Sequence, residues 1–308
     1  REVLAIDDLS NGRRENLRDL EGRKGYLGLV EGDVKDPRFV ARLFEGQRWD
    51  EVFHLAASIH VQKSIDDPWP TVRNDVEGTL VVLEQVRAQC FAQNGLDVGA
   101  KSFDFLRDRE KLKARTPRVA VMSTCMVYDA SAGSAIAETH PYRPASPYGA
   151  AKIGADMLAL SYALSYGMPV TVVRPFNTYG PFQKSNSEGG VVSIFLKRAL
   201  EGLPLLVKGD GTQTRDLLYV EDCADFIVRA IEAESAEGQI INAGTGSDIS
   251  VRALADLCKG PGVEVQHVTH DHPQAEIQRL LCDATKAQKL LGWTPRTSLA
   301  EGVERTRA

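Results

Sequence analysis

The sequence has little of what membrane, nucleic-acid-binding and disulfide-stapled proteins require. None of its 308 residues belongs to a run of roughly 18 consecutive apolar residues, the minimum for a membrane span. Its 37 basic residues against 42 acidic ones leave a net charge of −5, which excludes a generally basic surface for nucleic acid. The 5 cysteines form no CxxC pair. The sequence therefore predicts neither a metal site nor a disulfide framework, and we expect a cytoplasmic protein.

A Gly-rich phosphate loop is also missing, although the first residues have the pattern of a dinucleotide-binding strand. Val3–Ile6 is apolar, and Asp7 follows it where the acid of such a fold accepts hydrogen bonds from the adenosine ribose. An Asp after a strand is also common in turns, so this residue alone indicates little. The phosphate loop precedes such an acid by about 20 residues. We therefore expect a strand and a Gly-rich turn before Arg1.

Apolar runs of strand length alternate with longer amphipathic stretches. Valine-rich runs are typical of buried parallel strands, and several helical stretches start at capping or proline residues. This alternation predicts an α/β fold, a Rossmann-type doubly wound parallel sheet. The expected strands are Val3–Ile6, Val52–Leu55, Arg118–Met122, Val170–Val173 and Gln239–Asn242. The expected helices are Pro37–Phe44, Thr71–Val86, Ser146–Leu164, Val192–Glu201, Asp222–Ala233 and Val251–Cys258.

Two stretches depart from this alternation. Asn177–Gly190 is rich in Gly, Pro, Asn and Ser, and we expect it to form a long loop. Residues 89–116 have the composition of an insertion that ends in a charged run over 106–115. A solvated helix on an inserted loop explains that run, and partner binding is the alternative.

Tyr148 and Lys152 form the main chemical pattern of the sequence. Residues four apart share one face of a helix, so the phenol and the ammonium lie side by side. A neighbouring cation favours the phenolate, which makes Tyr148 a candidate acid/base toward a substrate hydroxyl. A YxxxK pattern alone often arises by chance, but Ser123 and Thr124 follow a valine-rich strand, at the edge where such sheets bind ligands. Ser/Thr, Tyr and Lys around one carbinol carbon form a site for hydride transfer to a nicotinamide.

These residues belong to a longer series of motifs. In the first half of the chain the motifs are Asp7–Gly12, Gly32–Val34, His54–Ala57, Asn74 with Gly78 and Thr79, Ser123 and Thr124 with Tyr128, and Tyr148 with Lys152. In the second half they are Arg174–Gly180, Gly209–Asp216, Tyr219–Asp222, Asn242–Gly246 and Leu291–Pro295. The series spans nearly the whole chain. In residues and order it resembles the extended short-chain dehydrogenase/reductase superfamily, in its nucleotide-sugar epimerase/dehydratase branch.

The resemblance implies NAD as the cofactor and a role for each matching residue. Thr124, Tyr148 and Lys152 would be the catalytic residues. The residues that would bind NAD are Asp7 at the adenosine ribose, Asp33 and Val34 at the adenine, Leu55, Ala56 and Ala57 along the pyrophosphate and ribose, and Asn74, Ser123, Tyr148 and Lys152 around the reacting end.

The resemblance also implies a nucleotide-diphosphate sugar as substrate and a homodimer. Asn177 and Arg215 would contact the diphosphate, and Val191 and Val192 would begin a helix whose amino end faces the nucleotide. The NAD-binding domain would comprise residues 1–176 and 215–247, and a smaller, mostly C-terminal substrate domain would comprise 177–214 and 248–308. The dimer would pack through the helices over 71–86 and 146–164, whose apolar residues exceed one core-facing stripe.

Two departures from the family pattern bear on the reaction. His272 precedes Pro273 where the family usually has an Arg that clamps the diphosphate. Cys125 and Met126 follow Thr124, where the dehydratases carry Asp-Glu. A thiol with a reference pKa of about 8.5 and a thioether are no equivalent acid/base pair. We expect Cys125 to be a packed, inert thiol, and a role as a weak acid is the alternative.

We therefore predict an NAD-dependent 4-epimerase that works through a transient 4-keto sugar. The alternative is a 4,6-dehydratase, or a UDP-glucuronate-decarboxylase-like enzyme, that uses the same oxidation at C4. Outside the enzymes, the alternative is a non-catalytic NAD-sensing protein. The complete set of Thr124, Tyr148 and Lys152 counts against it, because a binding module needs no acid/base pair.

Overall fold

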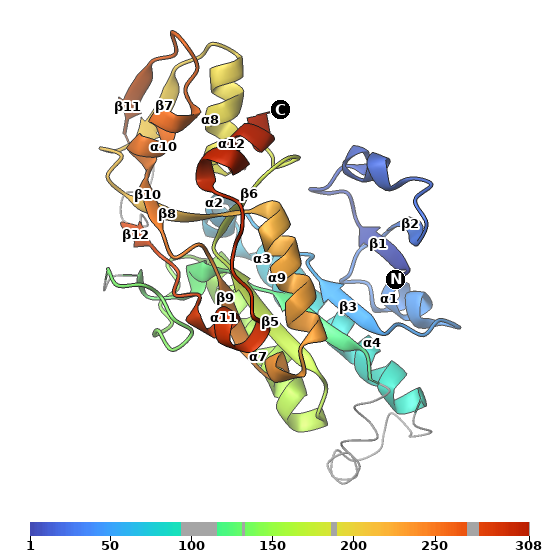
Figure 1. Cartoon of the computed structure of the whole chain (residues 1–308). Coiled ribbons are helices and arrows are strands. Elements are labelled where there is room, and N and C mark those ends of the chain that lie inside the picture. The colour runs from blue at the N-terminus through green and yellow to red at the C-terminus, as the bar shows by residue number, and fades with distance from the viewer. Residues whose placement is uncertain (94–115, 131–132, 186–189, 270–276, 308) are drawn as a thin grey trace.

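The computed structural model describes residues 1–93, 116–130, 133–185, 190–269 and 277–307 (Figure 1). Its centre is a four-stranded parallel sheet in the order β3 (Glu51–His54), β4 (Arg118–Met122), β5 (Val170–Pro175) and β9 (Ile240–Ala243). Val119 of β4 lies opposite Val52 of β3 and Val170 of β5, which sets the register of the three strands. The predicted α/β class with a parallel sheet is confirmed.

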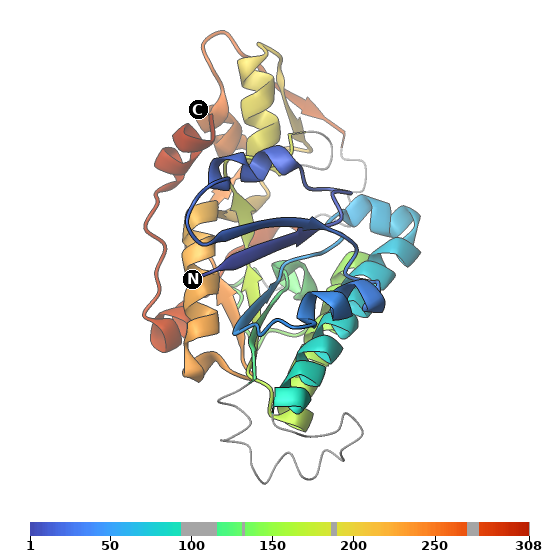
Figure 2. The ribbon, with the colours of Figure 1, turned by 90° about the vertical axis from the view of Figure 1, so that its right-hand side faces the viewer.

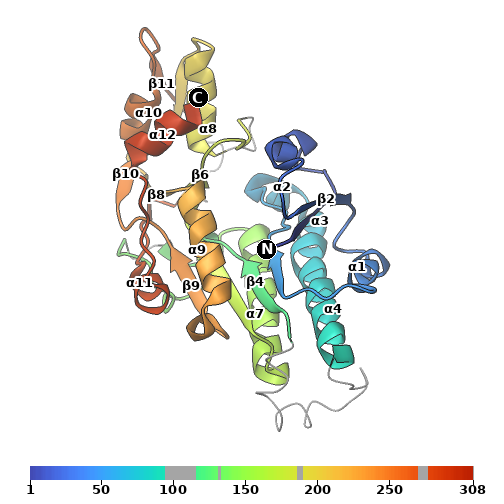
Figure 3. The ribbon, with the colours of Figure 1, turned by 45° about the vertical axis from the view of Figure 1, so that its right-hand side comes forward.

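Helices cover both faces of this sheet. The helices on one face are α4 (Gly78–Gln93) and α7 (Pro147–Tyr166), and those on the other are α9 (Val220–Glu232) and α11 (Thr285–Leu291) (Figure 3). Val119 and Val121 pack with α4 and α7, whereas Ala120 between them packs with α9. Successive side chains of a strand point to opposite faces, so these short valine-rich strands are buried on both sides.

Helix α7 has clear start and stop signals. The Ser146 hydroxyl caps its first turn by accepting from the Gly149 N–H at 3.3 Å, and Pro147 occupies the first helical position. Gly167 ends the helix with a φ of 64°, a left-handed conformation that favours glycine. Together with its packing against β5, these signals fix the helix that carries Tyr148 and Lys152.

The N-terminal strands form a separate sheet. β1 (Val3–Asp7) pairs in parallel with β2 (Tyr26–Glu31), and the 3₁₀ helix η1 (Arg14–Leu20) connects them (Figure 2). Within the described residues, no strand connects this two-stranded sheet to the four-stranded sheet that begins at β3. α1 (Pro37–Phe44) follows β2 and has the predicted bounds. The Asp36 side chain caps it by accepting from the Arg38 N–H at 2.9 Å.

The helix predicted over 71–86 forms in the structure, within a longer helical stretch over 68–93 that contains a π turn. α2 (Val61–Asp66) and α3 (Pro68–Val72) lead into a π-helical turn, η2 (Arg73–Glu77), and α4 follows. A π turn adds one residue to a helical turn, which the spacing of apolar residues does not reveal. The Thr79 hydroxyl donates to the carbonyl of Asp75 at 2.6 Å across this turn. The turn carries Asp75 into the interior, where it is 1% exposed.

A second, smaller lobe lies beyond one end of the four-stranded sheet (Figure 1). Strand β11 (Val265–Val268) pairs in parallel with β7 (Leu205–Lys208). The elements that contribute side chains to the core of this lobe are β7, α8 (Val191–Leu200), α10 (Val251–Cys258) and α12 (Leu299–Arg307).

Strand β8 (Thr214–Tyr219) connects the two lobes. Its neighbours are β6 (Asn177–Tyr179), β10 (Asp248–Ser250) and β12 (Arg279–Leu280). Leu218 packs into the core with α9, whereas Leu217 and Tyr219 pack into the core of the smaller lobe. β6 lies within the stretch predicted as a long loop. A strand that contributes to both cores holds the lobes in a defined relation.

The C-terminal part of the chain contributes to both lobes. Ala287 of α11 and Trp293 lie within 248–308, yet both pack with α9 and the four-stranded sheet. The short helix η5 (Glu234–Ala236) joins α9 to β9.

The five cysteines all lie within the described residues as buried thiols. No helix in the described part of the chain is long and apolar enough to cross a bilayer.

Candidate active site

The three predicted catalytic residues meet at the carboxyl end of β4. Thr124 follows β4 and caps the 3₁₀ helix η3 (Cys125–Val127), accepting from the Met126 N–H at 3.2 Å. Tyr148 and Lys152 lie in the first two turns of α7, which packs against η3. The backbone N–H of Tyr148 donates to Ser64 Oγ of α2 at 3.1 Å, and the phenol interacts with the Thr124 hydroxyl. Two elements thus bring a hydroxyl, a phenol and an ammonium together.

Burial has the largest effect on the acidity of Tyr148. The side chain is 7% exposed, and desolvation raises the pKa of the phenol because the phenolate is poorly solvated there. The Thr124 hydroxyl lowers this pKa, whereas the carboxylates of Asp75 and Asp156 raise it. The sequence predicts that the neighbouring Lys152 favours the phenolate. In the structure, the opposing effect of burial on the pKa is larger.

Lys152 belongs to a buried polar layer that the sequence motifs do not single out. His54 at the end of β3, Asp75 of η2 and Asp156 of α7 are all nearly inaccessible to solvent, and each interacts electrostatically with Lys152. Burial lowers the pKa of Lys152, and the two carboxylates raise it. Burial, with a contribution from Lys152, lowers the pKa of His54 to about 3, so this imidazole is neutral at physiological pH.

Asp156 and Arg174 form a fully buried ion pair. Arg174 donates to Asp156 Oδ2 through Nη2 at 2.7 Å and through Nε at 3.1 Å, and the Ser123 hydroxyl donates to the same oxygen at 2.7 Å. Arg174 also donates to the Tyr128 hydroxyl at 2.7 Å, which in turn donates to Asn242 Oδ1 at 2.8 Å. Burial raises the pKa of Asp156, and the Arg174 cation opposes this. The network ties α7 to the ends of β4, β5 and β9. One signal in the sequence could have found Asp156, because it lies one turn after Lys152 on the same helix face.

The residues expected to bind NAD lie after β1, β2 and β3. Asp7 is exposed at the end of β1, where a Cβ on Gly12 would lie 2.8 Å from its carboxylate. Val34 follows β2 and packs against Gly78, where an added Cβ would lie 3.2 Å from Val34 Cγ2. In the loop 55–57 after β3, 49% of Leu55 is exposed. An exposed acid and apolar loop residues fit the ribose hydroxyls and the uncharged surfaces of a dinucleotide.

Polar contacts connect these strand ends to η2. Lys35 Nζ lies 3.0 Å from Asp33 Oδ2 and donates to Asn74 Oδ1 at 3.1 Å. The Asn74 amide donates to Asp75 Oδ1 at 3.1 Å, and the Ser58 N–H donates to the same oxygen at 2.6 Å. The structure therefore brings Asp33 and Asn74, which are far apart in the sequence, to one side of the predicted NAD site.

The predicted substrate residues lie on the elements that lead into the smaller lobe. The Asn177 amide of β6 donates to the carbonyl of Asp216 at 3.2 Å. Val191 and Val192 begin α8, and Val192 is buried in the core of the smaller lobe. Val192 therefore anchors the helix, and the backbone at the start of α8 is the part available to a ligand.

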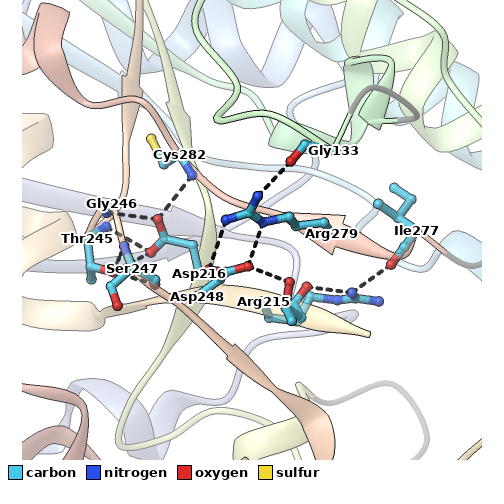
Figure 4. A network of polar contacts seen from close by, with 11 residues as sticks. Gly133, Arg215, Asp216, Thr245, Gly246, Ser247, Asp248, Ile277, Arg279 and Cys282 are labelled. Atoms are coloured by element: carbon cyan, nitrogen blue, oxygen red, sulfur yellow. Dashed lines mark hydrogen bonds and ion pairs between the residues drawn. The ribbon is translucent and has the colours of Figure 1, made fainter. Parts of the chain in front are cut away.

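Arg215 of β8 is held by backbone carbonyls. Its Nη1 donates to the carbonyl of Thr214 at 2.8 Å and to that of Ile277 at 2.7 Å (Figure 4). Cys125 interacts electrostatically with Arg215, which places this part of β8 near η3 and the residue after Thr124, a predicted catalytic residue. An oriented guanidinium of this kind can bind phosphate oxygens through two parallel hydrogen bonds.

A polar network surrounds Arg215 (Figure 4). Asp248 of β10 accepts from the Thr214 hydroxyl at 2.6 Å and from Arg279 Nε of β12 at 2.9 Å, and Arg279 also donates to the carbonyl of Gly133 at 2.7 Å. The hydrogen bond from Arg279 has the largest effect on the Asp248 carboxyl and lowers its pKa. These contacts join β8, β10 and β12.

Asp216 is the most highly bonded carboxylate of this region. It accepts from the Thr245 N–H at 2.8 Å, the Thr245 hydroxyl at 2.7 Å, the Gly246 N–H at 3.0 Å and the Cys282 N–H at 3.1 Å (Figure 4). Burial raises the pKa of Asp216, and these hydrogen bonds lower it. Asp216 thus connects β8 to the loop after β9 and to the residues after β12.

Some predicted features lie outside the described residues. His272 falls within 270–276, and most of the predicted insertion falls within 94–115, whereas residues 89–93 form the end of α4. Within the described ranges, no group of His, Cys, Asp and Glu side chains has an arrangement suited to a metal ion.

Known proteins resemble this chain over nearly its whole length. The GDP-mannose 4,6 dehydratase family matches residues 2–306. The UDP-glucose 4-epimerase of Mycolicibacterium smegmatis is 33% identical over 305 residues, which cover 99% of this chain and 89% of that protein.

Solved structures share the fold. Pal from Bacillus thuringiensis has a TM-score of 0.86 and 46% identity, over 100% of this chain and 90% of that one. DesIV, a dTDP-glucose 4,6-dehydratase from Streptomyces venezuelae solved with NAD and TYD bound, has a TM-score of 0.82 and 28% identity, over 99% of this chain and 86% of that one. The chain therefore belongs to the GDP-mannose 4,6 dehydratase family, among the NAD-dependent nucleotide-sugar epimerases and dehydratases of the extended short-chain dehydrogenase/reductase superfamily.

Proposed function

We propose that the chain catalyses the 4-epimerisation of a nucleotide-diphosphate sugar through a transient 4-keto sugar. The observation that carries this proposal is the convergence of Thr124, Tyr148 and Lys152 at the end of β4, near Arg215 of β8. Asp7, Asp33, Asn74 and Lys152 would hold NAD, which would supply the reversible hydride acceptor for the sugar C4 carbon.

The side chains of the site have separate tasks. Tyr148 accepts the proton of the C4 hydroxyl and later returns it, and the Thr124 hydroxyl beside it holds the same sugar oxygen. Lys152, one helical turn further, supplies a positive charge and a donor for the cofactor ribose. No second acid is needed, since epimerisation asks only that the ketone rotate within the site.

Nucleotide-diphosphate recognition is assigned to the elements leading into the smaller lobe. Two backbone carbonyls orient the Arg215 guanidinium, so it can bind phosphate oxygens without a large entropic loss. Asn177 of β6 and the backbone at the start of α8 complete this half of the site.

The residues after Thr124 favour epimerisation over 4,6-dehydration. Elimination of water needs a base at C5 and an acid at the C6 oxygen. Cys125 is 3% exposed in an apolar cluster, and burial raises the pKa of its thiol to about 12 although Arg215 opposes this. Met126 has no titratable proton. Dehydration is the second candidate, because the structure of the dehydratase DesIV matches 99% of this chain. A decarboxylase that uses the same ketone is the third.

The proposal includes a homodimer in the cytoplasm. Trp69 of α3, Leu80 of α4, and Met157 and Leu164 of α7 are large apolar residues that are exposed on one protomer. α4 and α7 pack side by side, so a partner that covers these helices removes the apolar residues from water. Five buried cysteines that form no disulfide agree with a reducing compartment.

The experiment that tests the function is a substrate panel. The full-length protein is incubated with NAD and with UDP-, dTDP-, GDP- and CDP-sugars in deuterated water, and the products are read by NMR. We expect inversion at C4, retention of the C6 oxygen, and no deuterium at C5 or C6, because no C5 carbanion forms. A 6-deoxy-4-keto product with deuterium at C5 would establish the dehydratase instead, and release of CO₂ the decarboxylase. NAD binding without turnover of any sugar would support the non-catalytic alternative.

A further inference from the structure

Asp75 is a buried carboxylate with one oxygen that has no hydrogen-bond partner. Its Oδ1 accepts from the Ser58 N–H at 2.6 Å and from the Asn74 amide at 3.1 Å, whereas Oδ2 accepts from no group in the described part of the chain. The residue is 1% exposed. A buried carboxylate is costly unless a cation or several donors compensate it. Oδ2 therefore requires a positive charge nearby.

The backbone around Asp75 is held in place from two sides. Asp75 lies in the π turn η2, and π turns are frequent at functional sites. The Thr79 hydroxyl donates to the carbonyl of Asp75, so the contact of 3.0 Å between His54 Nε2 and Thr79 Oγ1 requires the imidazole to donate. This assigns the Nε2–H tautomer to His54. The position of the Asp75 carboxylate is thus set by β3, α4 and the loop after β3.

The turn η2 packs against α7 at the level of Lys152. Gly154 lies two residues after Lys152, and Val76 directly follows Asp75. The two residues are close, since a Cβ added to Gly154 would lie 3.4 Å from Val76 Cγ2. Lys152 is 3% exposed, and its ammonium interacts electrostatically with the carboxylates of Asp75 and Asp156. Asp156 Oδ1 also lacks a hydrogen-bond partner among the described residues. Two carboxylates with one uncommitted oxygen each therefore surround the ammonium.

The charges of this layer balance only if the Asp75 carboxylate is the counter-charge of the Lys152 ammonium. Arg174 makes two hydrogen bonds to Asp156 Oδ2 and so neutralises that carboxylate. His54 is neutral, which leaves the Asp75 carboxylate for the Lys152 ammonium. The titratable and charged groups around the pair are His54 of β3, Asp75 of η2, Tyr148 and Asp156 of α7, Arg174 of β5, Cys125 of η3 facing Tyr148, and Lys35 facing Asp75 from the loop after β2.

We propose that Asp75 is a positioning residue of this enzyme, whose uncommitted carboxylate oxygen is the counter-charge that keeps the catalytic Lys152 protonated and directed at the reacting end of the site. The proposal deepens the proposed function and rests on the same catalytic residues. Asp75 itself touches neither sugar nor cofactor in this role. It acts through Lys152, and through the same field it raises the proton affinity of the Tyr148 phenol.

The first test is Asp75→Asn, which keeps the shape of the side chain and an oxygen for Ser58 but removes the charge. Loss of a negative charge lowers the proton affinity of both Lys152 and Tyr148. Both limbs of the pH profile of kcat therefore move to lower pH by about one unit. NAD affinity, measured by calorimetry from pH 6 to 10, falls at the alkaline end about one unit earlier than in the wild type.

The matched control is Asp222→Asn. Asp222 of α9 is also a buried carboxylate that accepts from a backbone N–H, that of Thr297 at 2.9 Å, and α9 covers the face of the four-stranded sheet opposite to α7. Its pH profiles should superimpose on those of the wild type. Profiles of Asp75→Asn that superimpose on the wild type, or that fall in amplitude without moving along the pH axis, would overturn the proposal.

A double-mutant cycle covers the case in which Asp75→Asn alone fails to fold. Lys152→Met removes the ammonium and leaves Asp75 as an uncompensated buried charge, so it should unfold at lower urea concentration than the wild type at pH 8. The double variant Asp75→Asn, Lys152→Met removes both charges and should unfold at higher urea concentration than Lys152→Met. If the effects of the two substitutions simply add, the pair is not coupled and the proposal is wrong.

These measurements test the role of Asp75 separately from the proposed 4-epimerase function. The pH dependence of NAD affinity and the urea cycle need no sugar substrate, so they test Asp75 even if the substrate panel shows dehydration or no turnover. A wild-type epimerase whose Asp75→Asn variant keeps both pH profiles would retain the proposed function and lose this inference.

Discussion

Tyr148 illustrates how one residue carries two opposing requirements. Its phenol must lose a proton to act as a base, yet burial raises its pKa, and two nearby carboxylates add to that effect. The Thr124 hydroxyl acts in the opposite direction. Deep burial nevertheless suits the proposed catalytic role of Tyr148, because a phenolate that forms in a dry site interacts strongly with every donor and cation around it.

Tyr148→Phe should abolish most of the turnover and keep the fold. The substitution removes the proton acceptor but leaves the ring that packs at the start of α7, so turnover should fall about 10²- to 10⁴-fold while NAD still binds. The measurement is a steady-state assay beside a calorimetric NAD titration. Tyr162→Phe is the control, since that phenol lies on the same helix and contacts Glu84. Turnover near the wild-type value in Tyr148→Phe would mean that another base operates.

His54 makes the stability of the protein depend on pH. Its pKa is lowered to about 3 in the folded state, against about 6.5 in an unfolded chain, so between these values only the unfolded state binds the proton. Stability conferred by the neutral imidazole is therefore complete above about pH 6.5 and is lost as the pH falls. Between pH 7 and pH 5 the loss is about 2 kcal/mol for this group.

His54→Gln should flatten that dependence. Urea unfolding at pH 7 and pH 5 gives the difference in free energy of unfolding, which should be smaller in the variant than in the wild type by about 2 kcal/mol. His267→Gln, which changes an exposed imidazole of β11, should keep the wild-type difference. An unchanged difference in His54→Gln would show that this imidazole does not control acid stability.

At the scale of elements, the π turn η2 and the strand β8 position most of the site. The apolar spacing over 71–86 predicts a regular helix, and the structure contains the π turn η2 within it, where the Thr79 hydroxyl donates to the carbonyl of Asp75. The sequence pattern does not predict β8 as a strand, since its first three residues are polar and its pairing partners come from distant parts of the chain. Sequence periodicity records local repeats, and both features depend on contacts between elements.

Asp216→Asn should destabilise the connection between the lobes. The carboxylate accepts four hydrogen bonds, and an amide presents an N–H₂ group to donors such as the Gly246 and Cys282 N–H groups. The unsatisfied buried donors should lower the free energy of unfolding by about 3 kcal/mol. Urea unfolding measures this, and Asp210→Asn in an exposed turn is the control. Equal unfolding midpoints for Asp216→Asn and the wild type would contradict the role of this residue.

At the scale of the whole molecule, two cores meet at β8, and the predicted active site lies where they meet. The predicted catalytic residues come from the larger lobe, and the predicted diphosphate contacts come from β6, β8 and α8. The order of motifs in the sequence predicts both the catalytic residues and the diphosphate contacts. That α11 and Trp293 return to the larger lobe follows only from the packing of their side chains with α9.

The exposed apolar faces of α4 and α7 predict an assembly. Light scattering of the wild type at micromolar concentration should give the mass of a dimer. Leu80→Glu with Met157→Glu places charges on adjacent helices and should give a monomer with an unchanged circular dichroism spectrum. Leu200→Glu, at a more exposed apolar position at the end of α8, should remain dimeric. A monomeric wild type would contradict the prediction.

The sequence by itself determined the alternation of strands and helices, the capping of α1 and α7, and the set Thr124, Tyr148 and Lys152. These features depend on residue type and short spacing, which a linear pattern contains. The tertiary structure alone decided which charges share the interior with Lys152. Asp75, Asp156 and His54 come from separate elements, and desolvation acts only once those elements have packed. The protonation of the site is therefore a property of the fold.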